Sequence, residues 1–211
     1  YSDHFVGVHT FVGNLAEEAC EAIGANSLLA RVGAYYHNIG KIEKAEYFSE
    51  NQPDTITSEH EELKPSMSSL IITSHVKDGV ELAKKYNLNH KITEFIQEHH
   101  GTGLVYYFYK KALEKGDLDS KVKDEDFRYP GPKPQSKEAA IVLLADSVEA
   151  ASRSIINPTP TKIKEQLQRI INNKFIDGQL DDCELTLRDL HKIADSFVRL
   201  LTGMFHTRVQ Y

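Results

Sequence analysis

The sequence predicts an all-α protein that folds as one helical domain over residues 1–211. Apolar residues recur at the three- and four-residue spacing of an α-helix along most of the chain, and residues typical of helix ends flank these segments. No two segments have the alternation that indicates a strand pair. The segment from Ala139 to Ile156 is apolar nearly all round, so we expect it to form a central buried helix on which the others pack.

The first half of the chain contains most of the predicted helices. They are residues 14–23, ended by Gly24; 26–38, capped by Asn26 or Ser27; 65–86, opened by Pro65 with Ser66 as the cap; 89–100, closed by Gly101; and 102–115, ended by Gly116. Residues 40–63 lack periodicity and contain Pro53, so we expect a long loop there. Loops of that length inside a compact domain are usually functional.

The second half begins with an irregular excursion over residues 117–134, which is acidic and then rich in proline. The central helix is predicted over residues 136–155. A helix from 159 to 174 begins with a Thr159 cap and Pro160 in the first helical position. The last helix, over 186–205, opens with a capping-box variant in which Asp189 follows Thr186 by three residues.

The bulk composition excludes several classes of protein. The net charge of −6 argues against a nucleic-acid polymer or an anionic membrane surface as the main partner. Two cysteines, Cys20 and Cys183, form neither a disulfide framework nor a thiolate metal site, and we expect both to be buried free thiols. The apolar run Ala139–Ala145 is too short to span a bilayer. Because the sequence starts at Tyr1, we expect a fragment of a longer protein.

Five residues have the chemistry of a metal site. His37, His75, His99 and His100 lie in or near the ends of predicted helices, and Asp146 is an acid inside the apolar central helix. Imidazole and carboxylate ligands suit borderline divalent metals, and an unpaired buried carboxylate would be costly. Each residue also has an ordinary explanation, as a helix-end or surface histidine or as a hydrogen-bonded buried acid. The joint arrangement, together with His37-Asn38 in "GAYYHNIGK", favours the metal site.

The segments that carry these residues resemble a known family. "HVKDG", "HHGT" and "YPGPKPQSKEAAIVLLADSVEAA" are similar to the HD-domain phosphohydrolases, and specifically to the cytoplasmic HD domain of seven-transmembrane, PgpH-type cyclic-di-AMP phosphodiesterases. Matching stretches cover almost the whole chain in order. The resemblance implies a bacterial protein at the cytoplasmic face of the membrane, joined to that membrane through segments outside this sequence.

The resemblance also implies an activity. It implies hydrolysis of cyclic di-AMP to pApA at a centre of two divalent transition-metal ions, with iron or manganese preferred. The implied metal ligands are His37, His75, His99, His100 and Asp146. Lys41 falls on the lysine of the family's HD-x-G-K stretch and is implied to contact phosphate.

Two departures from the family's pattern weaken this implication. The family has aspartate where this chain has Asn38, and a neutral amide offers one carbonyl oxygen in place of a bridging carboxylate. We therefore expect at least one metal to bind more weakly, with Asn38 still at a ligand and catalytic position. The family also has a histidine at the position of Val8. His9 is our preferred substitute, one residue away, and His4 lies a helical turn earlier.

The remaining site residues are candidates for substrate contacts. Arg153 follows Asp146 by seven residues and could contact phosphate, although a salt bridge explains it equally well. Tyr107 or Tyr109 could form a wall for an adenine base, although aromatic residues at helical spacing more often belong to a core. His60 lies in the expected 40–63 loop, which could cover the site, and is expected at the surface.

Three functions remain open at this stage. The first is a phosphodiesterase that cleaves cyclic di-AMP. The second is a catalytically degenerate HD domain that binds cyclic di-AMP as a sensor, which Val8 and Asn38 favour. The third is a di-iron oxygenase, supported only by a shared fold. The sequence does not distinguish cyclic di-AMP from other cyclic dinucleotides.

Overall fold

The computed structural model describes residues 3–48, 59–115, 122–156 and 158–207, with the side chains of residues 3–8, 115, 206 and 207 excepted. This part of the chain is helical and contains one isolated β-bridge, between Leu104 and Arg128. None of its helices is long and apolar enough to cross a membrane. The all-α prediction is therefore confirmed.

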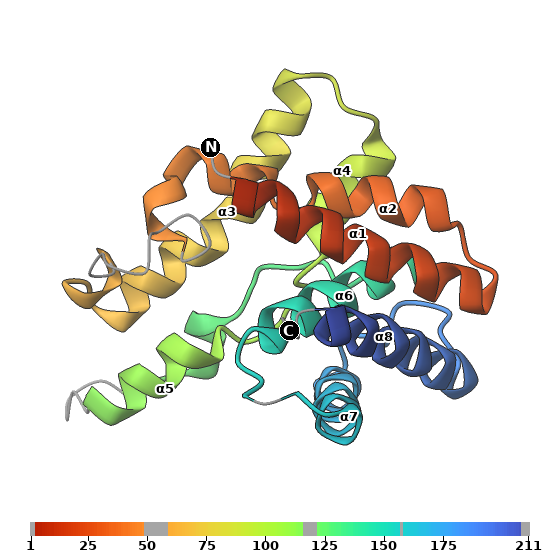
Figure 1. The fold of residues 1–211 in the computed structure, drawn as a ribbon. Helices are drawn as coiled ribbons and strands as arrows, with labels where there is room; N and C mark the ends of the chain where they lie inside the picture. The colour runs from red at the N-terminus through yellow and green to blue at the C-terminus, as the bar shows by residue number, and fades with distance from the viewer. Residues whose placement is uncertain (1–2, 49–58, 116–121, 157, 208–211) are drawn as a thin grey trace.

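The central helix is α6 (Lys137–Ser152), as the sequence predicts. Every residue from Ala139 to Ala145 is at most 1% exposed. α6 contacts α1 (Asp3–Ile23), α2 (Ser27–Tyr36), α4 (His90–Glu98) and α7 (Pro160–Ile176). These neighbours cover α6 on several sides, and Figure 1 shows it in the middle of the helical bundle. Asp146 is one of its partly exposed residues.

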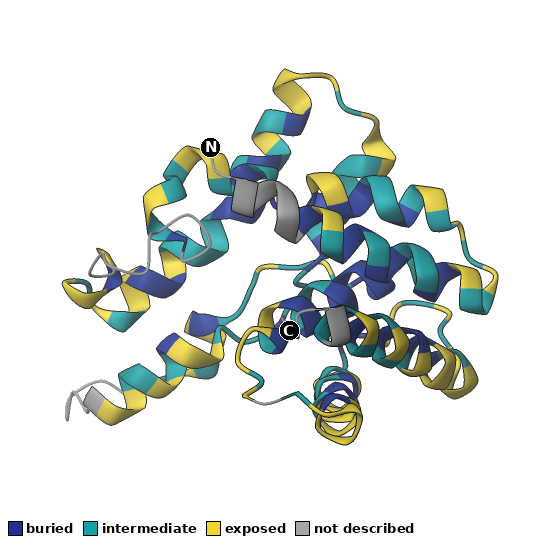
Figure 2. Ribbon diagram, viewed as in Figure 1, coloured by how far each residue is buried: buried dark blue, intermediate teal, exposed yellow. Residues whose placement is uncertain are grey.

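The peripheral helices are amphipathic and cover this centre. α8 (Leu187–Thr207) packs against α1 and α7, with Ile193 and Phe197 fully buried. α3 (Pro65–Lys85) contacts α4 and α5 (Tyr106–Lys115). In Figure 2 the outer faces of these helices are exposed and their inner faces are buried.

Most predicted helix ends are confirmed. Gly24 ends α1 with φ of +77°, in the left-handed region that glycine tolerates. Asn26 caps α2 by accepting from the Leu29 N–H, and Thr159 caps α7 by accepting from the Lys162 N–H. Thr186 and Asp189 exchange backbone-to-side-chain hydrogen bonds of 3.1 Å, so the capping box at the start of α8 is present.

Several local predictions are wrong. The helix predicted from residue 14 begins at Asp3, and the one predicted from residue 102 begins at Tyr106. Residue 66 is not a cap, because Pro65 occupies the first turn of α3 and Lys64 takes the cap position without a side-chain bond. The expected 40–63 loop contains two 3₁₀ helices, η1 (Ile39–Tyr47) and η3 (Glu59–Glu61), while residues 49–58 lie outside the described part. Cys20 is buried as expected, but Cys183 is only half-buried.

The η1 segment forms because its backbone packs directly on α3. A Cβ atom on Gly40 would lie 1.9 Å from the His75 carbonyl oxygen and 2.4 Å from the Gly79 nitrogen. Only glycine permits that approach. Short-range turn geometry and this tertiary contact replace the apolar periodicity that residues 40–47 lack. The short η4 (Asp124–Phe127) likewise interrupts the predicted excursion and buries Phe127.

Candidate metal centre

Four elements bring the predicted histidines together. His37 follows α2, His75 lies in α3, His99 and His100 follow α4, and Asp146 lies in α6. The ring centroids are 4.9 Å apart for His37 and His99, 5.2 Å for His75 and His99, and 5.2 Å for His75 and His100. The residues that the sequence grouped by chemistry alone are therefore neighbours in the fold.

Backbone hydrogen bonds fix the protonation of three of these rings. The Nδ1 atoms of His37, His75 and His99 lie 2.6, 2.6 and 2.9 Å from carbonyl oxygens three residues earlier in their own helices. A carbonyl only accepts, so each Nδ1 carries the hydrogen and each Nε2 is bare in the neutral ring. The Nε2 atoms of His75 and His99 nevertheless face each other at 3.1 Å. Two bare nitrogens at that distance require a proton or a cation between them.

Burial keeps the cluster in the form that metals bind. It is the largest cause that lowers the pKa of His75, to about 3, and that lowers the pKa values of His99 and His100 well below the usual range. Burial alone would raise the pKa of Asp146, but the His37 ring in contact with it, the His100 ring and the Lys41 ammonium hold it well below its usual range. The site thus combines the neutral imidazoles of His75, His99 and His100 with an ionised carboxylate.

The carboxylate joins the histidines into one donor set. Asp146 Oδ1 lies 3.2 Å from His37 Nε2, and Oδ2 lies 3.9 Å from His100 Nδ1. One ligand atom each from His75, His99 and His100 falls within 4.8 Å of the others. Imidazole nitrogen with carboxylate oxygen is the ligand set of zinc, iron and manganese sites rather than of calcium sites.

Asn38 adds an oxygen without a partner. Its side-chain amide Nδ2 donates to the bare Nε2 of His37 at 2.7 Å, which leaves Oδ1 pointing elsewhere. Asn38 is 2% exposed, and Oδ1 is buried without a hydrogen-bond partner among the described residues. Such an orphan acceptor is rare in a folded interior. Beside the bare Nε2 atoms of His75 and His99, it fits a bound cation.

His9 lies at the edge of this cluster. Its ring is 5.3 Å from that of His37, edge to face, and the residue is 7% exposed. The side chains of His4 and Val8 lie outside the described residues. His9, the preferred substitute, therefore has its ring beside that of His37.

The cluster opens into a cavity of about 550 Å³. Its wall includes the predicted residues Lys41, Tyr107 and Arg153, together with the ligand-type residues Asn38, His75, His100 and Asp146. Tyr109 does not line it and packs on Phe127 with ring centroids 5.7 Å apart. Phe108, which directly precedes Tyr109, does line the cavity and is 6% exposed.

Arg153 occupies the cavity wall as part of an ion pair. Its Nε and Nη2 atoms donate to the Glu149 carboxylate at 2.9 and 2.6 Å. The salt bridge considered from the sequence is thus present, and the phosphate contact stays a prediction. Lys41 also lies on the wall, with its Nζ 5.3 Å from the Phe48 ring centroid.

His60 corrects the sequence prediction of a surface loop residue. It is 8% exposed, lines the cavity, and packs against Phe108 with centroids 4.9 Å apart. Its Nε2 lies 2.9 Å from the Tyr47 carbonyl oxygen, which ties η3 to the end of η1. Sequence periodicity could not reveal this, because η3 is only one turn long.

Tyr129 and Lys111 are among the wall residues that sequence reasoning missed. Tyr129 stacks on His100 with centroids 4.1 Å apart and planes 24° apart. Lys111 lies one helical turn beyond Tyr107, with its Nζ 5.8 Å from that ring centroid. The four-residue spacing from Tyr107 was a sequence signal that could have revealed Lys111. Tyr129 had no such signal, because it reaches the site only where the proline-rich segment folds back over the histidines.

Comparison with known proteins identifies the family. The HD domain family matches residues 3–151. The chain belongs to the HD-domain family. Two curated relatives are each named cyclic-di-AMP phosphodiesterase PgpH. The one from Bacillus subtilis (strain 168) is 50% identical over 200 residues, and the one from Listeria monocytogenes serotype 1/2a (strain 10403S) is 47% identical over 200 residues.

Both alignments cover 95% of this chain, but they cover only 28% and 27% of the length of those relatives. A solved structure titled as the L. monocytogenes phosphodiesterase PgpH HD domain is similar over 97% of this chain and 95% of that chain, with a TM-score of 0.90 and 44% identity. A second, titled as the same domain in complex with cyclic-di-AMP, covers 96% of this chain and 93% of that chain with the same TM-score of 0.90 and 44% identity.

Proposed function

We propose that this HD domain hydrolyses a phosphodiester bond of cyclic di-AMP and yields pApA. The observation that carries the proposal is the set of bare imidazole nitrogens and the ionised Asp146 at one end of a cavity of about 550 Å³. The cavity wall also has cationic side chains from Lys41, Lys111 and Arg153. The names of the PgpH relatives support hydrolysis over nucleotide sensing alone.

We propose that two divalent ions, iron or manganese, bind at the cluster. The ligands would be His37, His75, His99, His100 and Asp146, with His9 and the Oδ1 atom of Asn38 at the edge. When bound, such ions supply Lewis acidity toward phosphoryl oxygens and activate water for attack on phosphorus. The protein's contribution is to present neutral rings whose Nδ1 hydrogens are already committed to backbone carbonyls.

The cationic residues of the wall would bind the phosphates. The Lys41 ammonium would offset charge that develops on the phosphoryl oxygens during attack. Glu149 holds the Arg153 guanidinium in a two-bond contact, which orients it toward the cavity without removing its charge. Lys111, on α5, is a third cation of the wall and suits the second phosphate of a cyclic dinucleotide.

Aromatic residues of the wall would bind the bases. Tyr107 is 67% exposed although it lies on the cavity wall, so its ring is available for stacking. Tyr129 is committed to His100 on one face. We propose Tyr107 as the base-stacking residue and leave Tyr109 out, because it packs against Phe127.

We further propose that this domain works at the cytoplasmic face of a membrane as part of a longer PgpH-type protein. The supporting fact is that the matched region makes up only 28% and 27% of the length of the two curated relatives. The proposal concerns location alone and leaves the chemistry of the cavity unchanged.

Turnover measurements test the function. The chain is incubated with cyclic di-AMP and excess Mn²⁺, and the appearance of pApA is followed by chromatography. We expect hydrolysis that chelation abolishes and Mn²⁺ restores. Tight nucleotide binding without any pApA, at full metal occupancy, would favour the sensor hypothesis. Equal turnover of cyclic di-GMP would show that the cavity does not select adenine.

A further inference from the structure

His100 differs from the other ligand-type histidines in how its ring is held. His37, His75 and His99 each donate from Nδ1 to a carbonyl of their own helix. In the part of the chain that the structure describes, the His100 ring has no such carbonyl contact, because the residue lies in the turn after α4. Its orientation must therefore come from that turn and from whatever packs on it.

The turn after α4 is held by backbone hydrogen bonds of its own and by side chains from distant segments. The Gly101 N–H donates to the Glu98 carbonyl at 2.9 Å, and the Gly103 N–H donates to the His100 carbonyl at 3.0 Å. The backbone N–H and carbonyl of Thr102 have their partners in distant segments. Its N–H donates to the side-chain oxygen of Gln179 at 2.8 Å, and its carbonyl accepts from Arg128 Nη1 at 3.0 Å.

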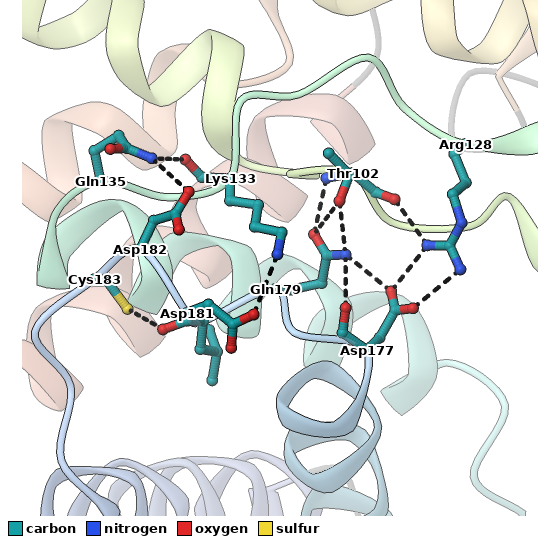
Figure 3. A network of polar contacts seen from close by, with 10 residues as sticks. Thr102, Arg128, Lys133, Gln135, Asp177, Gln179, Asp181, Asp182 and Cys183 are labelled. Atoms are coloured by element: carbon teal, nitrogen blue, oxygen red, sulfur yellow. Dashed lines mark hydrogen bonds and ion pairs between the residues drawn. The ribbon is translucent and has the colours of Figure 1, made fainter. Parts of the chain in front are cut away.

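Gln179 comes from the loop between α7 and α8 and is 0% exposed. Its amide nitrogen donates to Thr102 Oγ1 at 3.0 Å and to Asp177 Oδ2 at 2.9 Å. Asp177 in turn accepts two hydrogen bonds from Arg128, at 3.2 and 3.1 Å. Thr102, Gln179, Asp177 and Arg128 thus form a closed ring of polar contacts around the turn (Figure 3). We call these four residues the turn network.

Gln179 also packs against the glycine that adjoins His100. A Cβ atom on Gly101 would lie 2.3 Å from Gln179 Oε1, and Gly101 has φ of +54°. The amide therefore occupies the space beside the turn as well as bonding to it. A change at position 179 would release both the backbone of Thr102 and the conformation next to His100.

The turn network reaches the His100 ring by a second route. Tyr129 directly follows Arg128, and its N–H donates to the Gly103 carbonyl at 3.0 Å. The Tyr129 ring stacks on His100 with centroids 4.1 Å apart. Arg128 therefore fixes the strand-like segment from which the stacking ring projects.

Two members of the turn network lie beyond the part of the chain that matches the HD domain family. That match ends at residue 151, whereas Asp177 and Gln179 follow α7. Other contacts join the same loop to the proline-rich segment without touching the turn. Lys133 pairs with Asp181 at 3.2 Å, and Gln135 donates to Asp182 at 3.2 Å (Figure 3). They provide a control from the same loop.

We infer that Gln179, supported by Asp177 and Arg128, is a positioning residue that sets the orientation of His100 for metal binding. The inference rests on the proposed function in one respect, namely that His100 is a metal ligand. It assigns to the segment after α7 a role in the site that the HD-domain match does not cover. Gln179 acts through the turn and touches neither substrate nor metal.

The test compares metal affinity among variants of the full chain. Gln179→Met keeps the side-chain length and removes both polar groups. Lys133→Met removes an ion pair of the same loop and serves as the control. Mn²⁺ dissociation constants are measured by titration calorimetry, and the free energies of unfolding of the metal-free proteins are measured in urea. Co²⁺ absorption spectra report the ligand geometry independently of affinity.

We expect Gln179→Met to weaken binding of one Mn²⁺ ion by about tenfold, as for other groups that support a metal ligand. Its Co²⁺ spectrum should change, whereas Lys133→Met should leave both affinity and spectrum as in the unaltered chain. Arg128→Lys provides a milder variant should Gln179→Met not fold. It loses the two-bond contact with Asp177, and we expect about threefold weaker binding from the same argument.

The outcomes distinguish failure of the positioning role of Gln179 from failure of the proposed function. A Gln179→Met protein that is less stable when metal-free, yet binds Mn²⁺ with unchanged affinity and spectrum, would make Gln179 merely structural and overturn the inference. Failure of the unaltered chain to bind Mn²⁺ would overturn the proposed function and the inference with it.

Discussion

At the residue scale, Asn38 and His37 share a hydrogen bond that a metal at His37 would have to replace. The Asn38 amide donates to His37 Nε2 at 2.7 Å, so it occupies the lone pair that a cation would use. A carboxylate at position 38 has only acceptor atoms and would leave that lone pair open. It would also add a negative charge beside a bound cation.

We therefore expect Asn38→Asp to tighten binding of at least one metal ion by about tenfold or more, in line with the effect of other changes around metal ligands. The measurement is metal content per chain after dialysis against limiting Mn²⁺, with a calorimetric titration. Asn38→Ala is the control, because it frees the His37 lone pair without adding charge. Equal metal content in the unaltered chain and Asn38→Asp would show that position 38 does not limit occupancy.

Tyr107 and Tyr106 form a matched pair for testing the cavity wall. They are 67% and 66% exposed, but only Tyr107 lines the cavity. Base stacking on an aromatic side chain is worth about 1–3 kcal/mol. Tyr107→Ala should therefore weaken cyclic di-AMP binding by about 5- to 150-fold, while Tyr106→Ala should leave it within twofold. Calorimetry of the Ca²⁺-free, Mn²⁺-free chain with nucleotide gives the comparison, and equal affinities would remove Tyr107 from the site.

At the element scale, the contact of η1 with α3 depends on one missing side chain. Gly40 lies against the His75 carbonyl and the Gly79 backbone, and a Cβ atom there would overlap backbone atoms that cannot turn away. Overpacking of this kind costs about 1–3 kcal/mol when side chains can adjust, and more when they cannot. Because His75 itself is in the contact, η1 also supports the metal cluster.

Gly40→Ala should therefore lower the free energy of unfolding by about 3 kcal/mol or more, through backbone overlap. Urea unfolding monitored by circular dichroism measures the loss. Gly203→Ala in α8 is the control, because a Cβ atom there meets nothing within 4 Å. That change should stabilise the helix by up to about 1 kcal/mol. Normal stability of Gly40→Ala would mean that η1 can move off α3 without cost.

Sequence reasoning located the long helices because their signals are local. The Asn26 and Thr159 caps, the Thr186–Asp189 box and the Gly24 stop each act within one turn. It missed η1, whose formation depends on the distant Gly79. Cap placement at Ser66 failed because Pro65 can itself begin the helix, which moves the cap to Lys64, two residues before the serine.

In the candidate site too, some residues could be predicted from the sequence and others depend on distant contacts. The His37, His75, His99, His100 and Asp146 set could be assembled from residue chemistry and a family resemblance, because metal sites restrict ligand types. Tyr129 and Gln179 could not, since tyrosine and glutamine are common and neither belongs to a local pattern. Their roles depend on how the proline-rich segment and the α7–α8 loop fold back over the turn after α4.

At the scale of the whole molecule, the metal cluster joins four helices. Its ligand-type residues come from α2, α3, α4 and α6 or their ends, so a bound ion would tie together elements that span positions 37 to 146. The unfolded chain cannot present these groups in one place. Metal binding is therefore expected to stabilise the global fold rather than one loop.

Addition of Mn²⁺ at 100 times its dissociation constant should stabilise the chain by about 2.7 kcal/mol. For a domain of this size, each kcal/mol raises Tm by about 2–4 °C, so Tm should rise by about 5–11 °C. Differential scanning calorimetry with and without chelator measures it. Ca²⁺ at the same concentration is the control ion, because it prefers oxygen ligands and finds mainly nitrogen here. An equal shift with both ions would argue for nonspecific binding.

The metal-free molecule should be destabilised by acid. Burial lowers the folded-state pKa of His75 to about 3, below the value of about 6.5 expected in the unfolded chain, and the pKa values of His99 and His100 are lowered in the same direction. Between these values the unfolded chain binds more protons than the folded one. Stability is therefore fully present above about pH 6.5 and is lost as the pH falls toward 3, by about 1.4 kcal/mol per pH unit for each such histidine.

Urea unfolding in chelator at several pH values between 7 and 4.5 measures this slope. His75→Gln removes one of the buried rings and should make the slope shallower by about 1.4 kcal/mol per pH unit. His90→Gln is the matched control, because that side chain is 77% exposed and loses little solvation on folding. A metal-free chain whose stability does not change over this range would mean that the three rings accept protons in the folded state. A proton would then bridge the Nε2 atoms of His75 and His99, and their short separation would no longer indicate a cation between them.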